Sequence, residues 1–246
     1  MTYVDFRLSG KLDAPRIADT FQQDLRTQVR KILPKDLAVN FHRILANETP
    51  WQYTYFDGRK NNIVPLESFN SMTVEERQSI ADAVNQAAQQ GFAYSYNSFN
   101  FHQRIRQHEE VGPEFSEIDD FLNSSPFLEF ARRLTGDAEI TGTDASASWY
   151  GPGHFLNIHD DKRTGYDLRA AFVLNFSPLW RTDWGGELKF FSNRRGAKLE
   201  TAFFPAFNVM NIFSVPQYHA VGTVAAFAGA PRLSISGWLY AGTDPY

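Results

Sequence analysis

From about residue 138 onward, apolar side chains recur at every second position instead of every third or fourth, and this change of period constrains the fold more than any other feature. Short alternating or apolar runs follow one another there, separated by Gly, Pro, Asn and Asp turns, with no helical pattern between them. Consecutive short strands without helices predict an antiparallel sandwich or jelly roll and exclude a parallel βαβ sheet. The expected strands span residues 146–150, 155–159, 168–176, 186–191, 207–215, 219–224 and 232–240.

Residues 1–137 carry mainly helical patterns. Apolar residues recur at three- and four-residue steps until Pro34, which predicts one amphipathic helix over 13–33. A capping box predicts a second helix over 73–90, and a cap followed by a first-turn proline predicts a third over 125–135. We expect these helices to buttress the β region, so the fold class is α+β.

Two further segments lie between the second and third expected helices. Aromatic residues alternate over 92–101 as on a strand, and we expect them in the core. Residues 102–117 are polar and patternless, which predicts a long loop of the kind that closes over a site, with His102 solvated. No repeat or linker divides the chain, so residues 1–246 are expected to form one catalytic domain with a β core over 138–246.

The composition restricts the chemistry. The 246 residues include 0 cysteines, so any metal must be held by His, Asp or Glu. With 24 Lys plus Arg against 28 Asp plus Glu, the net charge of -4 argues against a nucleic-acid partner. The N-terminus lacks a signal-peptide pattern and no stretch of about 18 apolar residues occurs, so we expect no membrane span and a cytoplasmic location.

A candidate metal site begins at the end of the second expected strand. Residues two apart on a strand share a face, so His159 and Asp161 can offer one imidazole and one carboxylate to a single ion, while Asp160 points away. His219, at the start of another expected strand, supplies a third ligand. Two His and one carboxylate on one face of a metal are the ligands of non-haem Fe(II) oxygenases. Zinc is the alternative, but the His-Glu-x-x-His helix of many zinc hydrolases is absent from this sequence.

An arginine opens the last expected strand. Arg232 begins the sequence Arg-Leu-Ser-Ile-Ser-Gly-Trp, so Ser234 and Ser236 share its face. A guanidinium that faces into a barrel must meet an anion, because leaving a charge buried and unpaired is costly and the planar fork suits a carboxylate. We therefore expect a small dicarboxylate to bind on this face.

Taken together, these motifs resemble those of the 2-oxoglutarate- and Fe(II)-dependent oxygenases of the prolyl 4-hydroxylase type. The resemblance covers roughly residues 146–240 and the order of its motifs is specific. Within that superfamily, His-Asp-Asp and Trp-Arg-Thr-Asp-Trp-Gly-Gly-Glu-Leu are similar to the prolyl hydroxylases of a small-subunit ribosomal protein. The motifs are Tyr150-x-x-Gly153, His159-x-Asp161, Gly185-Gly-Glu-Leu188, His219, and Arg232-x-Ser234 with Trp238.

The resemblance implies a double-stranded β-helix, the cupin-like form of the jelly roll, with Fe(II) bound in it. The catalytic metal ligands it implies are His159, Asp161 and His219. It further implies that 2-oxoglutarate and O₂ are co-substrates, and it leaves a role for ascorbate open.

The same resemblance assigns the co-substrate site. Arg232 would hold the distal carboxylate of 2-oxoglutarate, and Ser234 would assist it. Tyr150 would hydrogen-bond the co-substrate, and Trp238 would form a wall of the pocket.

The expected reaction is hydroxylation of a prolyl residue in a protein or peptide, with release of succinate and CO₂. A ribosomal protein is one candidate substrate. A free amino acid or other small molecule is the alternative within the superfamily, and a zinc hydrolase or a non-catalytic metal- or ligand-binding jelly-roll sensor is the alternative of another class. The sequence specifies neither the substrate nor the position hydroxylated nor the oligomeric state.

Overall fold

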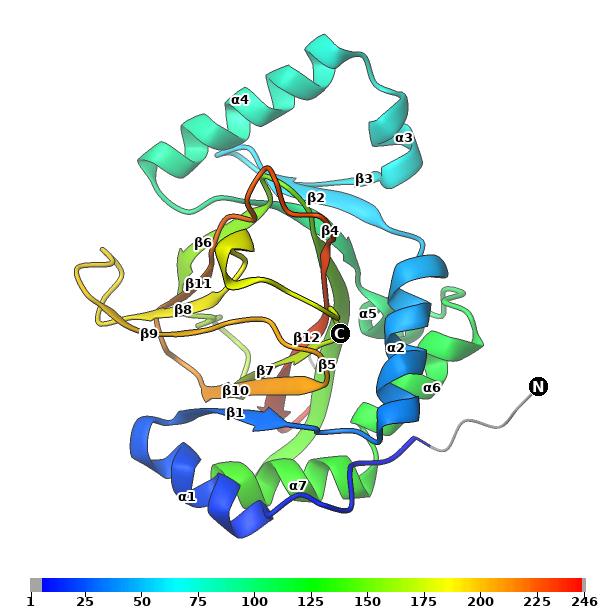
Figure 1. Ribbon diagram of the computed structural model, residues 1–246, viewed down its shortest axis with the longest axis vertical. Coiled ribbons are helices and arrows are strands. Elements are labelled where there is room, and N and C mark those ends of the chain that lie inside the picture. The colour runs from blue at the N-terminus through cyan, green and yellow to red at the C-terminus, as the bar shows by residue number, and fades with distance from the viewer. Residues whose placement is uncertain (1–5, 245–246) are drawn as a thin grey trace.

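The computed structural model describes residues 6–244, whose strands form one sheet curled almost into a barrel with helices on its outside (Figure 1). The helices are α1 (Ala14–Asp24), α2 (Lys35–Asn47), α3 (Leu66–Ser71), α4 (Val74–Gln90), α5 (Phe101–Arg106), α6 (Pro113–Leu122) and α7 (Ser125–Thr135). The strands are β1 (Arg26–Arg30), β2 (Gln52–Phe56), β3 (Asn61–Pro65), β4 (Tyr94–Phe99), β5 (Ile140–Tyr150), β6 (Phe155–His159), β7 (Leu168–Asn175), β8 (Leu188–Phe191), β9 (Leu199–Phe203), β10 (Val209–Ser214), β11 (His219–Val221) and β12 (Arg232–Ala241).

The strand order brings segments that are far apart in sequence side by side. Hydrogen-bonded neighbours run β1-β10-β7-β12-β5-β4-β6-β11-β8-β9, and the β2–β3 hairpin joins β4 through β2. The pairings are antiparallel, which confirms the predicted jelly roll and the α+β class. The register sets His219 opposite His159 and Arg232 opposite Tyr150. The sheet therefore places the predicted metal and co-substrate residues in one region.

Helices cover the sheet where β5, β12, β7 and β10 lie. In Figure 1, α1 and α7 run side by side below the sheet, and α2, α5 and α6 lie along its right-hand edge. Phe127 of α7 packs edge-on against Phe172 of β7, with ring centres 5.9 Å apart, and both rings are buried. Each fully buried phenylalanine contributes about 1.5–3 kcal/mol relative to exposure, so this layer holds the barrel rigidly, as the helical pattern predicted.

The second predicted helix forms over the residues expected. At the start of α4 the Thr73 side chain accepts from the Glu76 backbone N–H at 3.2 Å, and the Glu76 carboxylate accepts from the Thr73 N–H at 2.8 Å. The third predicted helix is α7. None of the helices within residues 6–244 has both the length and the apolar character that crossing a membrane requires.

The helix predicted over 13–33 is wrong in its second half. It ends at Asp24, Leu25 takes a left-handed φ of 54°, and the chain continues as β1. Thr27 and Val29 are buried on alternate positions, and β1 pairs with β10 along its whole length. The exposed edge of β10 thus satisfies the backbone of this segment, and tertiary pairing outweighs the helical spacing of its apolar residues.

The loop predicted over 102–117 is wrong except at residues 107–112, because α5 and the first half of α6 occupy the rest of it. His102, which was expected to be solvated, is 0% exposed, and its Nδ1 lies 2.6 Å from Asp119 Oδ1. Phe115 and Ile118 give α6 an apolar stripe that packs on the core. The segment therefore supports the barrel from behind and does not close over the site.

Candidate metal centre

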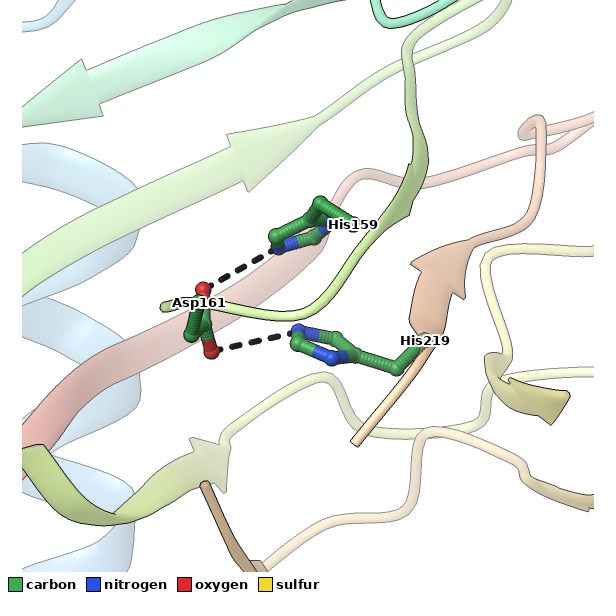
Figure 2. A group of neighbouring side chains, drawn as sticks. All are labelled: His159, Asp161 and His219. Atoms are coloured by element: carbon green, nitrogen blue, oxygen red, sulfur yellow. Dashed lines mark ion pairs between the residues drawn. The ribbon is translucent and has the colours of Figure 1, made fainter. Parts of the chain in front are cut away.

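Figure 2 shows three side chains that converge from two neighbouring strands. His159 ends β6 and His219 begins β11, where the two strands pair directly. His159 Nε2 lies 3.2 Å from one Asp161 oxygen, and His219 Nε2 lies 3.3 Å from the other. One ligand atom from each residue lies within 4.8 Å of the others, a spacing that fits a single bound ion.

The Asp161 carboxylate reaches the two histidines by a route that differs from the predicted one. Strand β6 ends at His159, and Asp161 adopts a left-handed φ of 59°. A turn, not strand alternation, therefore directs this carboxylate toward the histidines. The neighbouring Asp160 accepts a hydrogen bond from the Lys162 backbone N–H at 3.2 Å, within its own turn.

Backbone carbonyls fix the orientation of both imidazoles. His159 Nδ1 lies 2.8 Å from the Asn157 carbonyl oxygen, and His219 Nδ1 lies 2.8 Å from the Gln217 carbonyl oxygen. A carbonyl oxygen only accepts, so each Nδ1 carries a hydrogen and each Nε2 can offer its lone pair to a metal ion shared with the Asp161 carboxylate. Two such nitrogens and a carboxylate form the ligand set expected for Fe(II), so the residues fit this metal.

The electrostatics favour an ionised carboxylate between the rings. Burial alone would raise the pKa of Asp161, but the two histidines beside it lower it well below its ordinary value. Burial and the neighbouring His159 lower the pKa of His219 to about 4. Burial opposes the charged form of His159 too, yet the Asp161 carboxylate raises its pKa. Without a metal, the Asp161 carboxylate attracts a proton to His159. A bound divalent cation would replace that proton as the positive charge beside the carboxylate.

The metal ligands line one end of a cavity of about 110 Å³. All seven residues predicted for the site border it, although they come from four strands and a turn. They are Tyr150, His159, Asp161, His219, Arg232, Ser234 and Trp238. The structure therefore brings the predicted set together around one cavity.

Arg232 is the charged group within this cavity that has no ion-pair partner among the described residues. Its side chain is 2% exposed, its guanidinium carbon lies 5.1 Å from the centre of the Tyr150 ring, and its Nε has no hydrogen-bond partner in that part of the chain. Burial lowers the pKa of Arg232, an effect that the nearby Glu187 opposes. Glu187 itself pairs with Lys189 at 2.7 Å. An arginine in this position requires an anionic ligand in the cavity.

The remaining predicted residues form the walls around Arg232 and Asp161. Ser234 Oγ lies 2.8 Å from Ser148 Oγ, so its hydroxyl is held within the sheet. Burial raises the pKa of Tyr150 well above its ordinary value, so its hydroxyl stays protonated and can donate. Trp238 lies close enough to Asp161 to help lower the pKa of that carboxylate, but its indole N–H makes no hydrogen bond within the described residues.

Sequence reasoning missed Tyr96, which also lines the cavity. Its ring stacks on that of Tyr150, with centres 4.7 Å apart and planes within 10°. The aromatic run over 92–101 was expected to lie wholly in the core, whereas Tyr94 and Tyr96 are half-buried on one side of β4 and Ser95 and Asn97 are buried on the other. Their alternation was the available signal, because it separates the two faces of the strand.

Comparisons with known proteins agree with this geometry. Residues 145–240 match the family model described as the 2OG-Fe(II) oxygenase superfamily. A comparison with curated proteins finds no match. The matched stretch contains every predicted site residue, so the class that this fold and site define is the 2-oxoglutarate- and Fe(II)-dependent oxygenase.

Solved structures share the fold at low sequence identity. A Pseudomonas putida prolyl-4-hydroxylase superposes with a TM-score of 0.57 at 14% identity, over 93% of this chain and 99% of that one. A prolyl hydroxylase from Trichoplax adhaerens, solved with a peptide fragment of a hypoxia-inducible factor, gives 0.60 at 14% identity over 93% and 90%. The epimerase SnoN of nogalamycin biosynthesis gives 0.56 at 10% identity over 94% and 81%. The chain is thus a 2OG-Fe(II) dioxygenase with the double-stranded β-helix fold of the prolyl 4-hydroxylases.

Proposed function

We propose that this enzyme hydroxylates a prolyl residue of a protein or peptide, consuming 2-oxoglutarate and O₂ and releasing succinate and CO₂. The observation that carries the proposal is the single cavity in which a His₂-carboxylate triad faces a buried arginine without an ion-pair partner among residues 6–244. The triad matches Fe(II), and the arginine matches the distal carboxylate of 2-oxoglutarate.

Each residue has a defined task in this proposal. His159, Asp161 and His219 would hold Fe(II) from one side, which leaves the opposite side open to 2-oxoglutarate and O₂. Arg232 would orient 2-oxoglutarate through its distal carboxylate, and the protonated Tyr150 hydroxyl would donate a hydrogen bond to it. When bound, Fe(II) with these co-substrates supplies the oxidising chemistry that converts a C–H bond into C–OH.

Apolar walls keep the reacting region dry. Leu188, Phe213 and Val221 are buried around the triad and line the cavity. Exclusion of water strengthens the interactions of Arg232 and Asp161 with their ligands and protects the oxidising chemistry from side reactions.

The size of the cavity favours a peptide over a small molecule. Pockets that enclose a whole ligand commonly measure about 300–1,000 Å³. This cavity measures about 110 Å³ and must already admit 2-oxoglutarate, so the target carbon would be presented at its mouth by a residue of a larger chain. The fold similarity to two prolyl hydroxylases, one of them solved with a peptide, supports the same substrate class. The motif resemblance extends the proposal to a ribosomal protein in the cytoplasm.

Capture of the substrate tests this proposal. The variant His159→Ala is expected to lose Fe(II) and retain the substrate surface, so it should enrich a protein partner from a cell extract. Treatment of that partner with the wild-type enzyme, Fe(II), ascorbate and 2-oxoglutarate should add one oxygen atom at a prolyl residue, as seen by peptide mass spectrometry. Addition of oxygen to a different residue, or to free proline but to no peptide, would contradict the proposed substrate.

A further inference from the structure

Exposed arginines and aromatic rings lie close to the metal centre without lining its cavity: Phe92 contacts the His159 ring, Arg163 lies over Trp238, and Arg194 and Arg195 line a neighbouring hollow with Phe92. We call this set the aromatic–arginine rim, and it consists of Phe92, Tyr94, Arg163, Arg194 and Arg195. Within residues 6–244, the three guanidinium groups make no ion pair, although the chain as a whole has a net charge of -4. Their charge is therefore available to a ligand that binds beside the site.

The aromatic part of the rim touches the metal centre directly. The ring centre of Phe92 lies 5.7 Å from that of His159 and 5.8 Å from that of Tyr94. Phe92 is 36% exposed, so part of its ring is open to a ligand. Phe56 of the β2–β3 hairpin extends this surface, since its ring lies 6.1 Å from Phe92. A target residue can therefore rest on aromatic faces while it reaches toward the metal.

Arg163 lies on the cavity side of these rings. Its guanidinium carbon is 4.3 Å from the centre of the Trp238 ring, and Trp238 lines the cavity. Its positive charge also reaches Tyr94 and Tyr96, where it opposes the rise in pKa that burial produces. The exposed Arg163 side chain thus lies over Trp238 of β12 and near the tyrosines of β4.

Arg194 and Arg195 approach from the loop between β8 and β9. That loop follows Phe191, whose backbone N–H donates to the Tyr218 carbonyl at 2.9 Å, so it leaves the sheet beside His219. Both arginines are exposed, and together with Phe92 and Ile158 they line a hollow of about 620 Å³. Positive charge therefore lies on two sides of Phe92.

We propose that the aromatic–arginine rim binds an acidic segment that flanks the target prolyl residue, an inference that rests on the proposed function. Carboxylates match guanidinium forks bidentately, and proline-containing segments are extended and pack well on aromatic faces. A single-stranded nucleic acid also combines stacking with charge, but it is bound along a continuous basic groove. Three arginines on a chain of net charge -4 fit a short acidic peptide better.

Binding of two matched peptides tests the rim without any turnover. The probes are fluorescein-labelled Gly-Glu-Glu-Pro-Glu-Glu and Gly-Gln-Gln-Pro-Gln-Gln, mixed with wild-type protein that holds Mn(II) and 2-oxoglutarate, and followed by fluorescence anisotropy. The acidic probe is expected to bind roughly tenfold more tightly at low salt, and the difference should shrink as ionic strength rises. The variants Arg163→Glu and Arg194→Glu/Arg195→Glu should each remove most of it.

A matched arginine elsewhere provides the control. Arg30 is exposed and pairs with Val209, at the end of β10 that is remote along the strand from His219. Arg30→Glu should leave the preference unchanged, and equal thermal unfolding midpoints should show that all variants fold. Equal binding of the two probes, binding of neither at about 1 mM, or equal effects of Arg30→Glu and Arg163→Glu would each overturn the inference.

Two further readings separate the rim from the proposed reaction. Tighter binding of a single-stranded oligonucleotide than of the acidic peptide would overturn the inference in favour of a nucleic-acid partner. With Fe(II) in place of Mn(II), mass spectrometry reports oxygen addition to the bound probe. Selective binding of the acidic probe without hydroxylation would support the rim and contradict prolyl hydroxylation. Hydroxylation of both probes at equal rates would support prolyl hydroxylation and contradict the rim.

Discussion

Removal of the Arg232 side chain should abolish tight binding of 2-oxoglutarate while Fe(II) binding persists. The guanidinium is 2% exposed and can form a bidentate pair with the distal carboxylate of the co-substrate. Two charge-assisted hydrogen bonds at about 1.5–3 kcal/mol each predict a loss of about 3–6 kcal/mol, or roughly a 10²- to 10⁴-fold rise in Kd. The metal ligands lie on β6, its following turn and β11, so they should be unaffected.

A substitution at Arg232 that weakens 2-oxoglutarate binding should also raise the stability of the ligand-free protein. Arg232 Nε has no hydrogen-bond partner among the described residues, so the ligand-free protein carries a buried charge that an apolar side chain would not. Replacement even of paired buried charges by apolar side chains of similar volume is often neutral or stabilising by about 1–4 kcal/mol, and a charge without a partner has less to lose. The variant Arg232→Met is therefore expected to unfold at a higher temperature than wild type without 2-oxoglutarate, and to gain nothing when the co-substrate is added.

Calorimetric titration with 2-oxoglutarate in the presence of Mn(II), together with thermal unfolding, measures both effects. An unchanged 2-oxoglutarate affinity in Arg232→Met would show that another group holds the distal carboxylate. Equal loss of metal and co-substrate binding, with a lower unfolding temperature, would show that the arginine mainly supports the barrel.

Three other predictions concern the frame around the site. A Cβ at Gly237 would lie 1.9 Å from the Asp144 carbonyl oxygen. Gly237→Ala should therefore lower the free energy of unfolding by about 2–3 kcal/mol in chemical denaturation. An unchanged midpoint would contradict the close pairing of β12 with β5. Burial opposes the charged form of His102, but Asp119 raises its pKa above the ordinary 6.5. The stability lost in His102→Gln should therefore be largest below pH 6.5 and should decline as the pH rises through the folded-state pKa. A loss of stability that does not depend on pH would refute the ion pair. Thr73→Ala removes the capping hydroxyl of α4 and should cost about 1 kcal/mol by urea unfolding, whereas a neutral result would mean that packing alone fixes this helix.

The metal site could be predicted because its chemistry depends on residue type. Without cysteine, few combinations of His and Asp can hold a metal, and strand ends are where a barrel presents such ligands. Strand alternation predicted that His159 and Asp161 meet at one ion, and they do lie together, but a left-handed turn at Asp161 produces this, which alternation does not reveal. Arg232 was predictable because a charged residue within an apolar strand requires a partner.

The errors lie where tertiary contacts overrule local pattern. Val29 fits a helical stripe and an alternating strand equally well, and only the free edge of β10 decides between them. His102 appeared solvated because Asp119, its buried partner, lies on the next helix. The aromatic–arginine rim was not foreseen because it joins a strand start, the turn after Asp161 and the loop between β8 and β9, which no sequence window contains together.

The central claim is that His159, Asp161 and His219 form an Fe(II) site that works with 2-oxoglutarate. Succinate release by the purified protein tests it most directly, measured with Fe(II), ascorbate and 2-oxoglutarate, with and without the captured substrate, and repeated with His159→Ala and the surface control Arg30→Glu. We expect succinate formation that requires both Fe(II) and 2-oxoglutarate, rises when substrate is present, disappears in His159→Ala and persists in Arg30→Glu. Succinate formation that survives His159→Ala, or none from wild-type protein that holds iron and substrate, would contradict it.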